Sequence, residues 1–438
     1  MFAYYFQLSL RSLHRHPVLT GLVILTIAFG VGSSMTAYSL YRGMSGDPIP
    51  WKSSKLFFPQ IDGWGPQARN GRSEPSDALD YIDASALLRD HRAPLQSAIY
   101  SIAPTVYPND PSQKSIATPG HAVSSEFFAM ADTPFLFGTG WSVADDGHRA
   151  RVLVISKRLN QRLFSGANSV GQSIHLNDGS YRIVGVLNDW HPQPRFYDLA
   201  TSDAFGPADE LFLPFATAID AQMANAGGDF GCGNKLPASG FAGTLSSDCI
   251  WISYMVELDT AAQVRSYRDY LDGYAHAQQA SGRFAWPPNN RLRDLPNFMD
   301  FEQVVPSETK GVVVVAFCLL LVCMVNAVGL LLAKFLSRSG EIGVRRAMGA
   351  SRLAIAAQFG MESAAVGLVG GVLGLLLTCM GTARIRGALP SQVANLIRID
   401  PSLMLQTLLL AIAATVLAGL YPTWRAARVT PALQLKMD

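Results

Sequence analysis

Charged residues are scarce in this chain. They make up 16% of its 438 residues, whereas soluble globular domains carry about 25%. The shortage is concentrated in long uncharged runs near both ends, while the middle of the chain has an ordinary mixed composition. The formal net charge is only +2, so no overall field favours nucleic acid or another polyanionic partner.

Sequence motifs for catalysis are lacking as well. No Gly-Lys dipeptide occurs, so the sequence contains no phosphate-binding loop of the form G-x-x-x-x-G-K-[ST]. There is no H-E-x-x-H or other metal-ligand spacing, and the eight histidines are scattered. Asp189, Trp190 and His191 cluster after an apolar segment, where a Pro-constrained surface loop explains them better than a site does. We expect no enzymatic activity, metal or cofactor in this chain.

The uncharged runs are long enough to cross a membrane. A bilayer core about 30 Å thick needs roughly 20 apolar residues in a helix. Four predicted spans contain runs of this length: 17–43, which is uncharged as far as Tyr41, 311–333, 363–383 and 401–424. The first run is too long for the apolar region of a cleaved signal peptide, which is about 7–15 residues. The sequence therefore predicts four transmembrane helices.

Lysine and arginine residues beside the runs predict their orientation, because such residues accumulate on the cytoplasmic side. Three lie between the third and fourth runs: Arg384, Arg386 and Arg398. Ten flank the opposite ends of the runs: Arg11, Arg15, Lys334, Arg338, Arg345, Arg346, Arg352, Arg425, Arg428 and Lys436. We therefore expect both termini in the cytoplasm, with residues 44–308 outside as a domain and 384–400 as a short external loop. Residues 334–362 and the tail 425–438 are then cytoplasmic.

The first sixteen residues have an amphipathic pattern. Phe2, Tyr5, Phe6, Ser9 and Leu13 recur at a spacing of three to four, with basic residues gathered at the end. This pattern predicts an elbow helix over 1–16 that lies in the membrane interface. The alternative is a frayed start of the first span.

The external segment predicts an α+β domain. A strand over 151–155 precedes a helix with Ser156 as its N-cap. Residues 172–187 alternate around Asp178-Gly179, which is a hairpin signal. Further elements are a strand over 211–215 and helices over 76–90 and 261–280. Strands and helices in this order favour a mixed layer over a helical stalk.

Two cysteines belong to this external segment. The chain has five cysteines and no C-x-x-C pair, and Cys318, Cys323 and Cys379 lie inside apolar runs. Cys232 and Cys249 lie in a polar, glycine-rich stretch that faces an oxidising compartment if the predicted orientation holds. We predict a disulfide between them; the alternative is two free thiols.

The segment SRSGEIGVRRAMGASRLAIAAQFGMES, residues 337–363, is the most specific stretch of the sequence. It resembles the FtsX-like permease domain through Glu341, Ile342, Gly343, Arg345, Arg346, Gly349 and Ala350. The ending LAGLYPTWRAARVTPALQLK resembles the end of the same domain, and LFSGANSVGQSIHLNDGSYRIVGVL resembles the periplasmic core domain of MacB-type permeases. The three similarities occur in the expected order.

The resemblance implies a permease subunit of an ABC transporter in a bacterial inner membrane. Such permeases work as dimers, with the same or a related permease, beside two cytoplasmic ATPases that bind ATP and Mg. The segment matching 338–352 docks on the ATPase. MacB proteins carry a fused N-terminal ATPase, whereas this sequence starts at the elbow helix, so we expect a separate ATPase subunit. The resemblance also allows a periplasmic adaptor.

Glycines in the third run bear on the expected dimer. Gly367, Gly370, Gly371 and Gly374 form two G-x-x-x-G spacings, which let helices approach closely. They predict either a dimer seam through the first and third spans or close packing within one protomer. The runs lack the ionisable residues that a hydrophilic conduit normally needs, which favours mechanical transmission over a pore.

The resemblance leaves several functions open. We expect export or extraction of periplasmic or membrane cargo such as peptides, antibiotics or lipids, because the external domain is large. One alternative is an FtsX-like regulator that passes ATP hydrolysis to a cell-wall hydrolase, and another is a lipoprotein-release permease. A ligand-sensing receptor is disfavoured, because the sequence shows no signalling domain.

Overall fold

The computed structural model describes residues 17–66, 73–108, 114–177, 179–228, 230–234, 236–389 and 391–427. The predicted elbow helix over 1–16, Asp178 of the predicted hairpin and the tail beyond 427 lie outside the described residues. The chain divides into two compact units. One comprises Met1–Ser45 with Val305–Asp438, and the other comprises Gly46–Val304.

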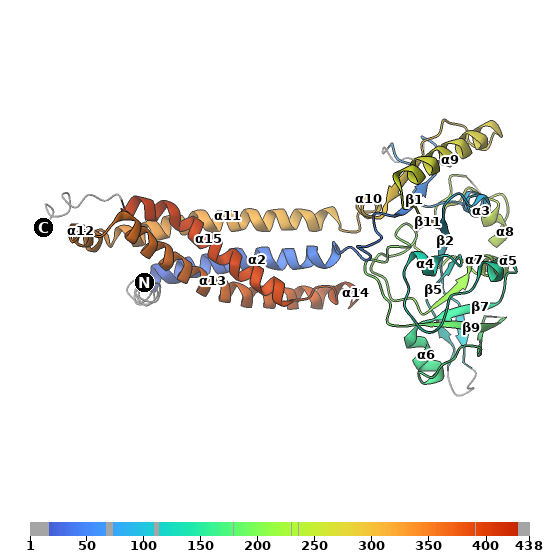
Figure 1. Ribbon diagram of the computed structural model, residues 1–438, viewed down its shortest axis with the longest axis horizontal. Coiled ribbons are helices and arrows are strands. Elements are labelled where there is room, and N and C mark those ends of the chain that lie inside the picture. Colours follow the sequence, from blue (N-terminus) through green and yellow to red (C-terminus); the bar gives the residue numbers. More distant parts are fainter. Residues whose placement is uncertain are drawn as a thin grey trace. The chain divides into compact units, whose positions relative to one another are not determined.

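The first unit consists of helices (Figure 1). Four of them are long and apolar enough to cross a membrane: α2 (Pro17–Met44), α11 (Ser307–Leu336), α13 (Arg352–Ala388) and α15 (Pro401–Ala427). Two short helices join them, α12 (Ser339–Ala347) and α14 (Ser391–Ala394). The prediction of four membrane helices with a large domain between the first and second is confirmed. At about 1.5 Å per residue, the 37-residue α13 is about 55 Å long and extends beyond a bilayer core.

The glycines of α13 pack against two helices of the same chain. At Gly367 and Gly371, an added Cβ would meet atoms of α15, with Thr415 Oγ1 and Ala411 Cβ nearest. Gly370 and Gly374 face α2 instead, where the backbone oxygens of Ile24 and Ala28 lie 3.5 and 3.3 Å from such a Cβ. Each G-x-x-x-G spacing therefore serves one helix contact inside the chain.

The second unit is built on one mixed sheet of 12 strands. The order is β12-β1-β11-β2-β5-β10-β7-β9-β8-β3-β4, with β6 paired to β9. The pairs β5–β10 and β7–β9 are parallel, and the other pairs are antiparallel. The strands are β1 (Leu56–Gln60), β2 (Leu95–Ile102), β3 (Thr105–Tyr107), β4 (Ile116–Ala117), β5 (Gly120–Val123), β6 (Phe135–Gly138), β7 (Val152–Ile155), β8 (Ser173–Leu176), β9 (Gly179–Leu187), β10 (Leu211–Pro214), β11 (Ser253–Glu257) and β12 (Arg291–Asp294).

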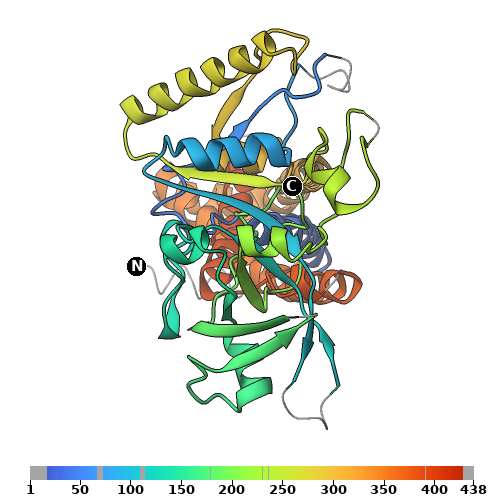
Figure 2. The same ribbon diagram turned by 90° about the vertical axis from the view of Figure 1, so that its right-hand side faces the viewer.

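The described residues of this unit form eight helices around the sheet, and the sequence locates several of them. They are α3 (Tyr81–Asp90), α4 (Phe127–Met130), α5 (Val143–Gly147), α6 (Lys157–Phe164), α7 (Phe215–Asp220), α8 (Gly240–Leu245), α9 (Ala261–Ala280) and α10 (Leu295–Phe301). Ser156 caps α6, because its Oγ accepts a hydrogen bond from the Leu159 amide. Figure 2 shows α9 (yellow) at one end of this unit and α6 (green) at the other.

A buried charged cluster fastens the segment after β9 to the sheet. His121 of β5 is fully buried, and its Nε2 and Nδ1 lie 2.9 Å from Asp198 Oδ2 and 2.9 Å from Asp209 Oδ2. The Tyr197 hydroxyl donates a hydrogen bond to Asp209. Burial alone would lower the pKa of His121, but the two carboxylates outweigh burial and raise this pKa to about 9.

The Asp-Trp-His sequence after β9 does not assemble into a site. Asp189 pairs with Lys157 at 2.7 Å, and the Trp190 ring stacks on Tyr197 with 5.4 Å between the ring centroids. His191 contacts Gln193 instead. The three consecutive residues thus have separate partners, as a surface loop would provide.

The structure joins Cys232 and Cys249 in a disulfide. The bond closes the glycine-rich loop beside Trp64, whose Nε1 donates to the Asp248 carbonyl at 2.7 Å. The ring of Trp64 lies against Gly231 and Gly233, where a Cβ would come within 2.8 and 2.7 Å of ring atoms. The loop is therefore pinned both covalently and by packing.

Candidate functional site

The predicted docking motif, Glu341 to Ala350, forms a short helix between two candidate spans. The chain leaves α11 at Leu336, forms α12 and turns into α13. Gly349 in the turn has a φ of +95°, which a residue with a side chain rarely adopts. Ser351 then caps α13, since its Oγ accepts from the Ala354 amide at 3.1 Å.

One face of α12 is buried in the helical unit. Ile342 is 4% exposed and belongs to an apolar cluster with Ile355 and Phe359 of α13. Phe335, near the end of α11, places its ring 4.3 Å from that of Phe359. This apolar contact brings the ends of α11, α12 and α13 together.

Charged side chains bracket the apolar contact. Glu341 accepts hydrogen bonds from Arg338 and from Arg345, at 3.2 Å to Arg338 Nη2 and 2.7 Å to Arg345 Nη2. Arg345 Nη1 donates to Gln358 Oε1 on α13 at 2.7 Å. At the other end, Arg338 Nη1 donates to Glu362 Oε2 on α13 at 3.1 Å. The contacts run from α13 through α12 and back to α13.

The innermost part of this network is fully buried. Lys334 of α11 has no exposed surface, Glu362 is 1% exposed, and the Lys334 Nζ lies 2.7 Å from Glu362 Oε1. From the sequence we interpreted Lys334 and Arg338 only as orientation signals and missed their role here. A lysine and a glutamate 28 positions apart carry no local signal of pairing; the signal exists only once the helices converge.

The opposite side of the segment is apolar and exposed. Val344 is 58% exposed, Met348 is 76% exposed and Leu353 is 80% exposed. Val344 and Met348 are four residues apart, so they lie on one side of the chain. We call Val344, Met348 and Leu353 the outward face. An exposed apolar group at the end of a transmembrane unit is typical of a protein-contact surface.

The seven residues of the predicted docking motif mostly build this segment instead of facing outward. Ile342 and Gly343 are buried, while Glu341 and Arg345 are one-third exposed and hydrogen-bonded inward. Gly349 and Ala350 form the turn, and Arg346 is half-buried. The motif therefore specifies the fold of the segment, and the outward face consists of residues that the motif does not contain.

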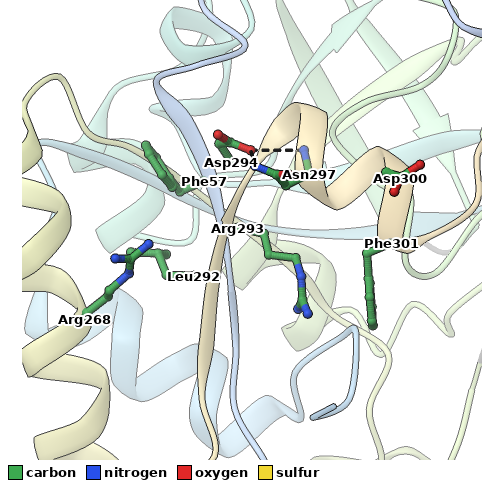
Figure 3. A pocket seen from close by; sticks show the side chains of 8 residues that line it. All are labelled: Phe57, Arg268, Leu292, Arg293, Asp294, Asn297, Asp300 and Phe301. Atoms are coloured by element: carbon green, nitrogen blue, oxygen red, sulfur yellow. Dashed lines mark hydrogen bonds between the residues drawn. The ribbon is translucent and has the colours of Figure 1, made fainter. Parts of the chain in front are cut away.

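The hollows of the external unit, Gly46–Val304, include two of similar volume. One, of about 390 Å³, lies beside the edge strand β12 (Figure 3). There Arg293 lies over the Phe301 ring at 4.1 Å, and Asn297 donates to Asp294. The other, of about 400 Å³, lies between α3, α5 and α7, with the ion pairs His91–Glu126 and Arg149–Asp220 among its lining residues. In the described part of the chain, no group of three or more His, Cys, Asp or Glu residues could hold a metal ion.

Family models match both units of the chain. The MacB-like periplasmic core domain matches residues 20–274, which is more than half of the chain. The FtsX-like permease C-terminal model matches residues 313–431 and includes the whole segment around α12.

Individual relatives are distant and longer than this chain. The macrolide export ATP-binding/permease protein MacB of Acinetobacter baylyi is 23% identical over 379 residues, covering 85% of this chain and 50% of the relative. The protein of the same name from Pasteurella multocida is 22% identical, covering 99% of this chain and 60% of the relative. The chain thus spans about half to three fifths of the length of these curated relatives.

Among solved structures, the periplasmic region of MacB from Actinobacillus actinomycetemcomitans is similar with a TM-score of 0.36 and 13% identity, covering 58% of this chain and 94% of that one. The extracellular domain of the transporter YknZ from Gram-positive bacteria gives a TM-score of 0.32 and 11% identity, covering 52% of this chain and 94% of that one. The two family models, in the order found here, carry the assignment. The chain belongs to the MacB-like, FtsX-like family of ABC transporter permeases, and is a membrane protein with an extracytoplasmic domain.

Proposed function

We propose that this permease couples ATP hydrolysis by a partner ATPase to movement of its external domain, and so exports or extracts periplasmic or membrane cargo. The ATPase must come from outside these 438 residues, because they contain no phosphate-binding loop. Following the sequence-based expectation, we propose a separate subunit that binds ATP and Mg. The observation that best supports this proposal is the structure of the α12 segment. Charged side chains bind the segment to α13, and three apolar side chains on its other side are exposed.

The composition of the spans supports mechanical coupling. The runs 17–41, 311–333, 363–383 and 401–424 contain no Asp, Glu, Lys or Arg. A hydrophilic path across a bilayer normally uses ionisable or strongly polar side chains. The buried ion pair of Lys334 and Glu362 lies just outside these runs, next to α12. This position supports the proposal that force enters at that end of the spans.

We propose that the outward face enters an apolar groove on the ATPase. Burying an apolar side chain of this size contributes about 1.5–3 kcal/mol, and every 1.4 kcal/mol corresponds to about a tenfold change in affinity. Loss of one such contact should therefore weaken binding by roughly tenfold or more. The excess of Lys and Arg beside α12 supports a cytoplasmic location for this end and for both termini.

We further propose that two permease copies assemble with two ATPases. The glycine faces of α13 are occupied by α2 and α15 of the same chain. A contact between copies would therefore use other residues of the spans, such as the exposed Leu22, Leu25 and Phe29 of α2.

The test is recovery of ATPase activity with the affinity-purified permease, extracted from its native membrane in mild detergent. We expect Met348→Glu to lower the recovered activity by about tenfold, since it places a charge in the proposed apolar contact. Leu236→Glu is the matched control, because Leu236 is also an exposed apolar residue, at 43%, but lies in the external unit. It should recover as much activity as the wild type.

Two outcomes would contradict the proposal. If the intact wild type recovers no ATPase under these conditions, the transporter function is wrong, and a receptor becomes the better hypothesis. If Met348→Glu and Leu236→Glu recover equal activity, the outward face is not the docking surface.

A further inference from the structure

One buried carboxylate holds the break between α11 and α12. Lys334 lies in the last turn of α11, and Arg338 immediately precedes α12. Their side chains bind different oxygens of Glu362, with 2.7 Å from Lys334 Nζ to Oε1 and 3.1 Å from Arg338 Nη1 to Oε2. A single side chain of α13 therefore spans the point where the other two helices separate.

A second contact fixes the far end of α12. Arg345 reaches Gln358, which lies four residues before Glu362 on α13. Four residues correspond to about 6 Å along a helix, so α12 is attached to α13 at two points separated by one turn. A single attachment would act as a pivot, whereas two attachments also fix the tilt of α12 relative to α13.

From this geometry we infer that Lys334, Arg338 and Glu362 are positioning residues: they form a rigid joint through which a displacement of α12 moves α11 and α13 together. The inference rests on the proposed function, since the displacing load would come from the ATPase. It adds a specific route for the displacement. At its N-terminal end, α11 continues into the chain of the external unit, and α13 contacts α2 and α15 through its glycines.

The energetics favour a positional role over simple stabilisation. Taking two charges out of water costs several kcal/mol each, and well-packed apolar residues often replace a buried ion pair with no loss of stability. Apolar packing by Phe335, Ile342 and Phe359 already holds the three helices together. The charged side chains add a fixed relative orientation of the helices, since a carboxylate with a cation on each oxygen fixes the relative placement of its partners.

The experiment must separate positioning from folding. Glu362→Gln alone would leave Lys334 charged and buried without its carboxylate, which is strongly destabilising. The informative variant, the apolar joint, removes all three charges together as Lys334→Met, Arg338→Met and Glu362→Met. The matched control removes another interhelical ion pair of the same unit, Arg42→Met with Asp400→Met, whose charged atoms are 2.8 Å apart.

The first measurement needs no partner. Ile342→Cys is introduced into the full-length protein after Cys318, Cys323 and Cys379 are replaced by Ala, and its reaction with a maleimide is timed in membranes. Ile342 is 4% exposed, so we expect slow labelling with the intact joint and with the control. The apolar joint should label about tenfold faster, because apolar packing keeps the helices together without fixing the tilt of α12, so position 342 reaches water more often.

The second measurement uses the complex with the co-purified ATPase. The apolar joint should retain the ATPase, because the outward face is unchanged, but lose the ATP-dependent change in protease cleavage of the external unit. The reversed pair, Lys334→Glu with Glu362→Lys, is made together with Arg338→Met, because Arg338 would otherwise face a lysine at position 362. It restores one buried ion pair, and should restore protection of Ile342→Cys and at least part of the ATP response. A purely structural role of the three residues does not predict this combination of retained binding and lost response.

The result that overturns the inference is an apolar joint with wild-type labelling and a wild-type ATP response. If the wild type binds no ATPase, the proposed function fails, while the labelling rates still decide whether the joint fixes α12. The two failures are thus distinguishable.

Discussion

Replacing Gly367 by alanine tests how the spans pack within the chain. A Cβ at this position would lie 2.1 Å from Thr415 Oγ1, 2.9 Å from Ile412 Cα and 3.1 Å from the Ala411 carbonyl oxygen. Two of these atoms belong to the backbone of α15, so a side-chain rotation cannot relieve the clash. The helices must separate locally for Gly367→Ala to be accommodated.

The expected magnitude is the difference between two effects. Overpacking a close contact costs about 1–3 kcal/mol, whereas Gly→Ala inside a helix contributes about 0.5–1 kcal/mol of stability. We therefore expect Gly367→Ala to lower the free energy of unfolding by about 1 kcal/mol, within a range of about 0–2.5 kcal/mol. Gly360→Ala is the matched control on the same helix, since a Cβ there meets nothing within 4 Å. It should be neutral or stabilising.

The assay is thermal unfolding of the two detergent-purified variants beside the wild type. For a unit of about 150–250 residues, 1 kcal/mol shifts the midpoint by about 2–4 °C, so the two variants should move in opposite directions. Equal stabilisation by both would refute the packing of α13 on α15 and leave Gly367 free for a contact between copies. A loss of dimer without a loss of thermal stability would point to the same conclusion.

Two further predictions concern the external unit. The pKa of His121 is raised from 6.5 to about 9; a raised pKa means that its stabilising contribution is complete below about pH 6.5 and is lost as the pH rises through about 9. The thermal unfolding midpoint of the wild type should therefore fall as the pH rises between these values, and His121→Phe should remove that part of the pH dependence. If the substitution leaves the pH profile unchanged, His121 does not make the proposed ion pairs. The Cys232–Cys249 disulfide closes a sequence separation of 17, so Cys232→Ser with Cys249→Ser should lower stability by about 3 kcal/mol. Alkylation of the wild-type protein followed by intact-mass measurement should label neither residue unless a reductant is added.

The sequence predicts elements of the fold where the signal is local. The four spans follow from hydropathy alone, and α9 begins and ends where its predicted helix does, at Ala261 and Ala280. The β8–β9 hairpin and the Ser156 cap are local in the same sense. Strand order is different, because it depends on pairs far apart in sequence. β1 lies between β11 and β12, although Leu56 pairs with Glu257 and Phe57 pairs with Asp294. No periodicity in these segments indicates which strand is the partner.

The cluster around His121 shows the same limit for polar residues. Its members come from β5 and from the segment between β9 and β10, and each looks like an ordinary solvated residue in the sequence. Only burial makes them partners: once His121 has no exposed surface, both of its ring nitrogens need hydrogen-bonding or ionic partners. The sequence therefore predicts a domain here, but not the buried contacts that hold the segment between β9 and β10 against the sheet.

For the candidate site, the limit lies in what a family motif encodes. The motif predicts docking by the segment 338–352, yet Glu341, Ile342 and Arg345 point into the helical unit. Positions that build a shared helix–turn–helix joint need particular residues, because each must satisfy a specific partner on α11 or α13. An outward apolar face needs only bulk and hydrophobicity, so Val344, Met348 and Leu353 leave no distinctive pattern in a single sequence. It follows that substitutions at Arg345 would test the attachment of α12 to α13. Docking is better tested at the outward face.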